Sequence, residues 1–149
     1  MPQAQRLKTH TNDAKYGAAE EIMAMPAARV VAILEDADSS VFAKAKACQR
    51  LAVVGDDAAV PALAKLLADA QLSHYARIAL EPMPGAAASD ALRTALARVK
   101  GRMLAGVINS VGIRRDARAI PQLMKLRQDS DPDIARAADT ALARVRPPL

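Results

Sequence analysis

The sequence predicts an all-α chain built from about four stacked pairs of helices. Three observations lead to this prediction. Alanine, the best helix former, supplies 35 of the 149 residues, while aromatic residues make up only 2%. Apolar residues recur with helical spacing, and no run alternates as a half-buried strand would. Finally, apolar positions repeat with periods near 30 residues, punctuated by similar glycines and prolines.

The clearest copy of the repeat is residues 43–67, AKAKACQRLAVVGDDAAVPALAKLL. Its first helix carries an apolar stripe from Ala47 to Val54, and Gly55 ends it. Its second helix has Pro61 in the first turn, where the missing N–H costs nothing. Neither helix can bury its own stripe, so the unit is expected to stack on copies of itself.

The register of the repeat can be followed along two columns with spacings of 28 to 34 residues. In the first helices the column is Leu51, Leu80, Ile108 and Leu142. In the second helices the column is Val30, Leu63, Leu92 and Leu123. Both columns are predicted to lie in the core. The second helices, at about 27 to 35, 58 to 68, 90 to 100 and 117 to 128, are expected to present Lys65, Arg93, Lys100, Gln122 and Lys125 on a concave face.

Residues 1–12 are predicted to form a flexible tail, and residues 13–146 a single domain. Asn12 or Asp13 can cap a first helix that runs to about Ala24. Pro26 then opens a second helix, 27–35. This pair resembles a degenerate copy of the repeat and is expected to shield one end of the stack.

The central copies are delimited by serines and prolines. Asp38, Ser39 and Ser40 are candidate caps for the helix before Gly55. The next copy begins at Ser73 with a short helix cut off by Pro82 and Pro84, and Ser89 is expected to cap its partner.

The last copies begin after Gly101. Gly112 takes the place that Gly55 holds in the clearest copy, so it is expected to stop a helix. The turn is then widened to IRRDAR, where Asp116 can cap the following helix. Asp131, followed by proline, opens a final helix that ends near Val145.

This pattern resembles the HEAT repeat, especially the short bacterial, phycobilisome-lyase-like kind, over residues 26–145. The resemblance rests on the small-apolar first helix, the Gly-Asp turn, the A-V-P-A-L segment and the Asp-Pro-Asp sequence before the last helix. It implies a right-handed superhelix (solenoid) of antiparallel helix pairs that usually serves as a binding scaffold. HEAT-like DNA glycosylases share the repeat but use aromatic residues near an acid, and this chain has no Trp.

The charge is uneven along the chain. Residues 1–74 carry a net charge of −1 and residues 75–149 a net charge of +6, which together give +5. The basic half can attract an acidic protein or a phosphate backbone, or it can be an ordinary solvated surface. The first residues lack the apolar region of a signal peptide and no membrane-spanning run occurs, so a cytoplasmic protein without membrane contact is expected.

Two polar clusters are candidate partner-binding sites. The first is His74, Tyr75, Arg77 and Glu81, whose spacing brings donors and acceptors to one side of a helix. The second surrounds the widened turn and comprises Asn109, Arg114, Arg115 and Arg118. Arginine forks suit carboxylate or phosphate groups. The alternative interpretation is structural: an ion pair and a packed tyrosine in the first cluster, and in the second Arg114 or Arg115 paired with Asp116 or with the next repeat, where Asn109 hydrogen-bonds a loop carbonyl.

No catalytic constellation is present in the sequence. The chain has two histidines, His10 and His74, and one cysteine, Cys48, so neither a metal site nor a cofactor is expected. We therefore predict a non-enzymatic scaffold, a monomer or weak homo-oligomer, that binds a protein or peptide. Nucleic-acid binding through the basic half is the rival hypothesis, and a purely structural spacer is a third.

Overall fold

The computed structural model describes residues 12–146 of the chain. The regular secondary structure of this part is helical apart from a short ladder, in which Asn12 pairs with Ala18 and Asp13 with Gly17. The predicted all-α class is therefore confirmed. The expected tail lies, except for Asn12, outside the described residues, as does His10. The elements are β1 (Asn12–Asp13), β2 (Gly17–Ala18), α2 (Ala19–Met23), α3 (Ala27–Glu35), α4 (Val41–Val54), η1 (Asp57–Ala59), α5 (Val60–Leu66), α6 (Ser73–Leu80), α7 (Ala86–Ala95), α8 (Gly101–Ile113), η2 (Ala117–Ala119), α9 (Ile120–Leu126) and α10 (Pro132–Val145).

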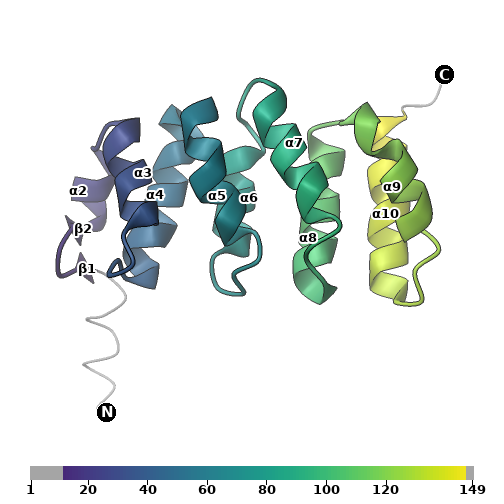
Figure 1. The fold of residues 1–149 in the computed structure, drawn as a ribbon, viewed down its shortest axis with the longest axis horizontal. Helices are drawn as coiled ribbons and strands as arrows, with labels where there is room; N and C mark the ends of the chain where they lie inside the picture. Colours follow the sequence, from purple (N-terminus) through teal and green to yellow (C-terminus); the bar gives the residue numbers. More distant parts are fainter. Residues whose placement is uncertain (1–11, 147–149) are drawn as a thin grey trace, which may run out of the picture.

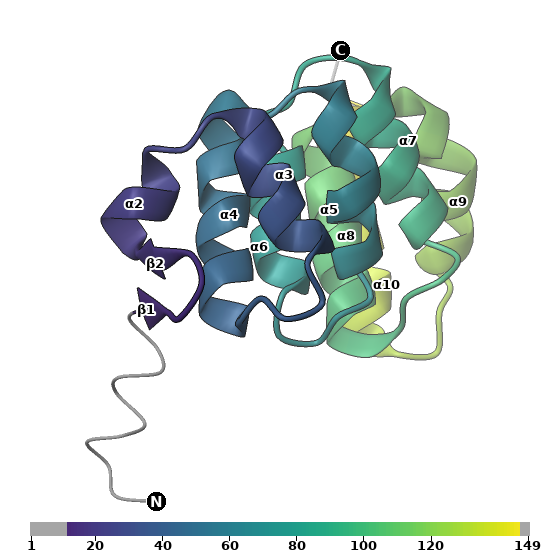
Figure 2. The same ribbon diagram turned by 60° about the vertical axis from the view of Figure 1, so that its left-hand side comes forward.

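The helices form two layers that extend along the long axis of the molecule (Figures 1 and 2). The first layer is α4, α6, α8 and α10, and each of these helices contacts the next. The second layer is α3, α5, α7 and α9, in which α3 contacts α5 and α5 contacts α7. The N-terminal ends of the first-layer helices lie along the lower edge of Figure 1. No helix of the described residues is both long and apolar enough to span a bilayer.

The core between the layers is aliphatic. Both predicted register columns lie in it: Leu51, Leu80, Ile108 and Leu142 in the first layer, and Val30, Leu63, Leu92 and Leu123 in the second, all at most 8% exposed. Alanines such as Ala47, Ala76 and Ala138 are fully buried between them. Small side chains let neighbouring helices approach closely, which explains why so alanine-rich a chain can bury a continuous core.

The predicted helix from residue 13 to residue 24 is wrong for most of its length. Asp13 does not cap a helix. Its carboxylate accepts hydrogen bonds from the amides of Lys15 and Tyr16, both at 2.8 Å, and from Ser40 N at 3.0 Å. These bonds fold residues 13–16 into a turn, and Gly17, with φ of +84°, completes the hairpin. Only the five-residue helix α2 remains of the expected helix.

Two predicted helix boundaries are also wrong. α7 starts at Ala86, three residues before Ser89, because Gly85 adopts a φ of +92° that allows the chain to turn into the helix there. Gly112 lies inside α8 rather than after it. A Cβ on Gly112 would lie 2.9 Å from Cα of Ala141, so this glycine permits α10 to pack closely on α8.

Other predicted boundaries are confirmed. Gly55 follows the last residue of α4. The side chains of Ser40, Asp116 and Asp131 accept amide hydrogen bonds at the starts of α4, η2 and α10, respectively. Ser39 does not cap a helix, and its hydroxyl instead donates to Ile33 O at 2.8 Å.

Candidate functional site

A polar cluster joins α6 to α8, and we call His74, Arg77, Glu81 and Ser110 the α6–α8 cluster. On α6, Nη2 of Arg77 lies 3.2 Å from Nδ1 of His74, and Nη1 lies 4.0 Å from Oε1 of Glu81. From α8, the Ser110 hydroxyl donates to Glu81 at 2.6 Å. Arg77 in turn donates to Gly106 O at 3.1 Å and to Ser110 Oγ at 3.3 Å. Helical spacing predicted the α6 side of this cluster but not its α8 partners.

The guanidinium of Arg77 is held between the two helices. Its side chain is 15% exposed, and burial lowers the pKa of Arg77, an effect that the charge of Glu81 opposes. Its Nε has no hydrogen-bond partner among the described residues. A Cβ on Gly106 would lie 2.7 Å from the guanidinium, so the glycine makes room for it. The site therefore holds a buried positive charge that is only partly compensated.

Tyr75 lies apart from Arg77 and Glu81. Its side chain lines a groove of about 600 Å³ together with Phe42 and Lys46 of α4. The Tyr75 ring approaches the His74 ring edge-on, with centroids 5.7 Å apart. The four residues predicted as one patch are thus divided between the α6–α8 interface and the α4–α6 groove.

Arg114 is fully engaged with the turn that joins α6 to α7. Its Nη1 donates to the carbonyls of Leu80 and Glu81, both at 3.0 Å, and of Met83 at 2.6 Å. Nη2 donates to Gly85 O at 2.8 Å, and Nε donates to Ser89 Oγ at 2.8 Å. The guanidinium therefore organises a proline-rich turn of the neighbouring pair of helices.

Asp116 pairs with Arg93 of α7, at 2.8 Å between Oδ2 and Nε. It does not pair with Arg114 or Arg115, which was one of the two arrangements that the structural interpretation allowed. The hydrogen bond to Asp116 is the largest influence on the pKa of Arg93, which is raised. The other Asp116 oxygen accepts from the amide of Arg118 at 3.1 Å. This carboxylate thus ties α7 to the start of η2.

The remaining residues of the second cluster diverge. Asn109 accepts a hydrogen bond from Nη1 of Arg144 on α10 at 3.1 Å, and within residues 12–146 its amide does not donate to a loop carbonyl as expected. Arg115 has a φ of +54° and is exposed in the turn after α8, and Arg118 is exposed on η2. The structure therefore brings no more than Arg115 and Arg118 of this cluster to the same stretch of surface.

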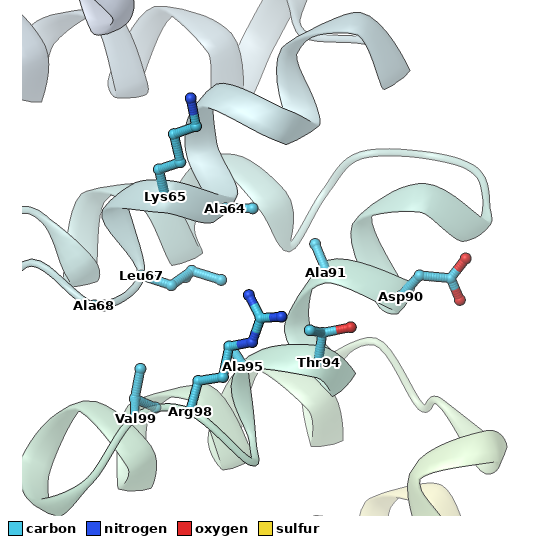
Figure 3. Close-up of a pocket in the computed structure, with 10 residues that line it drawn as sticks. All are labelled: Ala64, Lys65, Leu67, Ala68, Asp90, Ala91, Thr94, Ala95, Arg98 and Val99. Carbon is cyan, nitrogen blue, oxygen red and sulfur yellow. The ribbon is translucent and has the colours of Figure 1, made fainter.

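Sequence reasoning missed a cleft between α5 and α7, in the second layer (Figure 3). We call it the α5–α7 cleft. It has a volume of about 330 Å³, and its walls are mainly small apolar side chains, including Leu67, Ala68 and Ala91. Arg98 extends toward its centre, with Thr94 beside it, whereas Asp90 points away (Figure 3). The alanines that recur on α5 and α7 were the available signal, because small side chains leave space between neighbouring helices.

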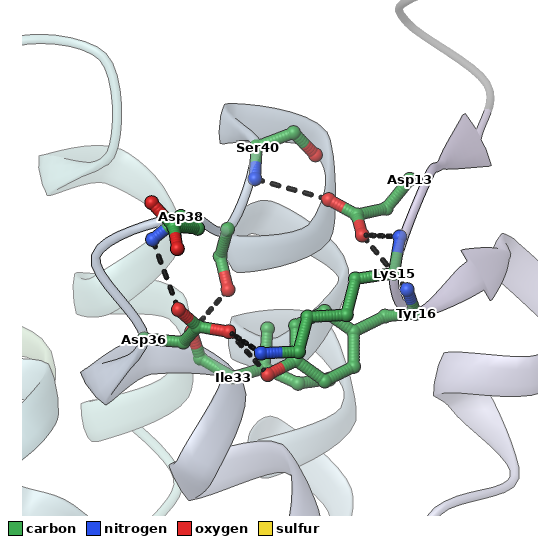
Figure 4. A network of polar contacts seen from close by, with 8 residues as sticks. Asp13, Lys15, Tyr16, Ile33, Asp36, Asp38 and Ser40 are labelled. Carbon is green, nitrogen blue, oxygen red and sulfur yellow. Dashed lines mark hydrogen bonds and ion pairs between the residues drawn. The ribbon is translucent and has the colours of Figure 1, made fainter.

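A second unpredicted feature is a hydrogen-bond network around the carboxylate of Asp36, in the turn between α3 and α4 (Figure 4). Asp36 accepts hydrogen bonds from Nζ of Lys15 at 2.8 Å, from the Tyr16 hydroxyl at 2.6 Å and from the Asp38 amide at 2.9 Å. The bond from Lys15, followed by that from Tyr16, holds the pKa of Asp36 well below its usual value. This network fastens the β1–β2 hairpin to the α3–α4 turn.

Metal-ligating and nucleophilic side chains are a separate matter from the polar clusters. Among residues 12–146, no three His, Cys, Asp or Glu side chains gather as a metal site requires. Cys48 is fully buried in α4, and burial raises the pKa of its thiol to about 12. A thiol in that state is a poor nucleophile at neutral pH.

Comparison of the chain with protein-family models found no match, and comparison with curated proteins also found none. The interpretation of function therefore depends on the residues and on their geometry. Two surface features are candidate binding sites: the α5–α7 cleft of the second layer and the basic side chains near the start of α8.

Proposed function

We propose that this chain is a non-catalytic, HEAT-like helical-repeat scaffold that docks a segment of a partner protein in the α5–α7 cleft. The observation that carries the proposal is the cleft itself, which combines small apolar walls with the cationic Arg98. A segment with an aliphatic side chain next to Asp or Glu complements both features. Apolar anchors in pockets, accompanied by polar contacts at the rim, are the usual source of affinity in such interfaces.

The repeat nature of the scaffold is supported by a hydrogen bond that recurs at three turns. Asp36, Asp69 and Asp129 each follow a second-layer helix and accept from the amide two residues later, at 2.9, 2.8 and 2.8 Å. The first two are 33 residues apart and the last two 60, close to one and two periods. Recurrence of the same turn bond is what copies of one structural unit would give.

The distribution of basic side chains favours a protein partner over nucleic acid. Five arginines of the basic half are engaged with other residues of the chain: Arg93, Arg114, Arg127, Arg136 and Arg144. Arg115 and Arg118 lie beyond one end of α8, and Lys100 and Arg102 lie at the other. The 13-residue helix separates them by about 20 Å, so they form no single stripe along a phosphate backbone.

The proposal is tested by selecting short peptides from a random displayed library on the immobilised protein. Enriched peptides are expected to share an aliphatic residue flanked by Asp or Glu. Thr94 is exposed and lines the cleft, so Thr94→Trp fills the cleft without disturbing the core. Excluding one aliphatic anchor costs about 1.5 to 3 kcal/mol, or roughly 10- to 150-fold in Kd.

The matched control is Ala97→Trp, which adds the same side chain at an exposed position that does not line the cleft. It is expected to bind the selected peptides as the unmodified protein does. Peptides that bind equally well to the Thr94→Trp variant would refute docking in the cleft. Tighter binding of a labelled DNA duplex than of any selected peptide would favour the nucleic-acid hypothesis instead.

A further inference from the structure

A second cleft, separate from the α5–α7 cleft, lies between the N-terminal ends of α6 and α8. We call it the basic cleft. Its volume is about 720 Å³, and its lining includes His74 and Arg77 of α6 together with Lys100 and Arg102 of α8. No Asp or Glu is among the residues that line it. Three fixed positive charges and a histidine thus face one space, with no carboxylate to compensate them there.

The deepest of these charges is already short of a partner. The nearest carboxylate to Arg77, that of Glu81, is 4.0 Å away and accepts a 2.6 Å hydrogen bond from Ser110. The Nε of Arg77 has no acceptor among the described residues. A buried cation without a close counter-charge is costly, and an anion in the adjacent cleft would reduce that cost.

Two turns border the basic cleft: the α5–α6 turn, which contributes Ala70, and the α7–α8 turn, which contributes Lys100. The α7–α8 turn departs from the other turns of the molecule. Asp36, Asp69 and Asp129 each lie six residues after a buried residue of the second-helix register, and each carboxylate accepts the amide two residues later. The residue six positions after Leu92 is Arg98, and two residues later stands Lys100. At this turn a cation therefore replaces the carboxylate.

The residues that precede the two helices beside the basic cleft provide no side-chain cap of their own. Ser40 and Asp131 cap α4 and α10, whereas Leu72 and Lys100, which precede α6 and α8, accept no such bond; near α6, Asp69 accepts the amide of Leu72 at 3.0 Å. Amides at a helix N-terminus attract negative charge. This feature adds to the three positive charges of Arg77, Lys100 and Arg102, on which the character of the cleft depends.

We propose that the basic cleft binds a phosphate monoester group, whose oxygens interact with Arg77, Lys100 and Arg102. A phosphoryl dianion matches several converging cations better than a single carboxylate does, because it offers more charge and three acceptor oxygens. The volume exceeds what a bare phosphate needs, which leaves room for the group that carries the ester. The proposal does not depend on peptide docking in the α5–α7 cleft.

The proposal is tested by titrating the ¹⁵N-labelled protein at constant ionic strength with inorganic phosphate, a phosphoserine peptide and a nucleoside monophosphate. Saturable shifts are expected in the amides of residues 73–75 and 100–103. Equal affinities would assign binding to the phosphoryl group itself, and a tighter peptide or nucleotide would identify the source of the ester. Both results support the site.

The test variant is the double substitution Lys100→Gln/Arg102→Gln, at two exposed positions whose loss leaves the core intact. Losing two charged contacts is expected to weaken phosphate binding by about tenfold or more. The matched control, Arg115→Gln/Arg118→Gln, removes the same charge beyond the other end of α8 and is expected to change Kd by less than about twofold.

Three results would overturn the proposal. The first is the absence of saturable shifts with any phosphate probe. The second is an equal loss of affinity in the control variant, which would mean that only the overall charge matters. The third is binding of glutamate as tight as that of inorganic phosphate, which would show that the cleft does not select a phosphoryl group.

Discussion

Replacing Arg114 by methionine tests whether this residue has a structural role. Methionine keeps much of the length of the side chain but removes all five hydrogen bonds to the α6–α7 turn. Met83 is buried, so water cannot easily replace the donor to its carbonyl, whereas the Leu80 carbonyl still accepts from the Met83 amide at 3.3 Å and Gly85 is exposed. Each buried group left unsatisfied costs about 1 to 3 kcal/mol. The expected loss, from the Met83 carbonyl, is therefore about 1 to 3 kcal/mol.

The free energy of unfolding is measured by urea denaturation followed by far-ultraviolet circular dichroism, since the chain contains no Trp. Arg114→Lys is expected to lose most of the same stability, because one ammonium group cannot reproduce the planar fork. The control Arg118→Met changes an exposed arginine and is expected to stay within about 0.5 kcal/mol of the unmodified protein. A loss below about 1 kcal/mol for Arg114→Met would refute the role inferred from these contacts.

Three further predictions follow from the buried groups. Gly106→Ala places a Cβ 2.7 Å from the guanidinium of Arg77, so it should displace that side chain and weaken phosphate binding, seen by titration, even though alanine favours the helix by about 1 kcal/mol. Burial raises the pKa of Asp13, but hydrogen bonds from Ser40 and the 15–16 amides outweigh it and hold the pKa below 3.8. Because the folded pKa is depressed, this stabilisation is present above about pH 4 and is lost as the pH falls through the folded value. Asp13→Ala should therefore destabilise at neutral pH, and the difference should shrink in urea titrations below about pH 4. Cys48, whose thiol pKa burial raises to about 12, should react with a disulfide reagent at pH 8 only after urea unfolds the chain, and rapid labelling of the native protein would contradict its burial.

The layered arrangement of the core was predictable because it depends on local patterns. Apolar residues at helical spacing were enough to predict which positions of both register columns lie in the core. Gly55, Ser40 and Asp131 marked helix boundaries because the capping and helix-ending preferences of these residue types act within a few residues. The prediction of the first helix was wrong because an aspartate such as Asp13 can cap a helix or close a turn equally well. The turn is favoured by Ser40, which lies 27 residues away and whose amide donates to the carboxylate of Asp13.

The candidate site was less predictable because its contacts are distant in sequence. Spacing on one helix placed His74, Arg77 and Glu81 together, but Ser110 reaches Glu81 from 29 residues away. Likewise, the IRRDAR motif identified Arg114 as unusual without indicating that its hydrogen bonds would be satisfied inside the protein. The clefts arise from the distances between helices, which depend on all of the packed side chains together.

The central proposal, that the α5–α7 cleft docks a protein segment, is tested most directly by mapping a selected peptide on the ¹⁵N-labelled protein. We expect amide shifts over α5 and α7, centred on residues 64–68 and 90–99, and their loss in the Thr94→Trp variant but not in Ala97→Trp. Shifts confined to α4, α6, α8 and α10, or shifts unchanged by Thr94→Trp, would contradict the proposal.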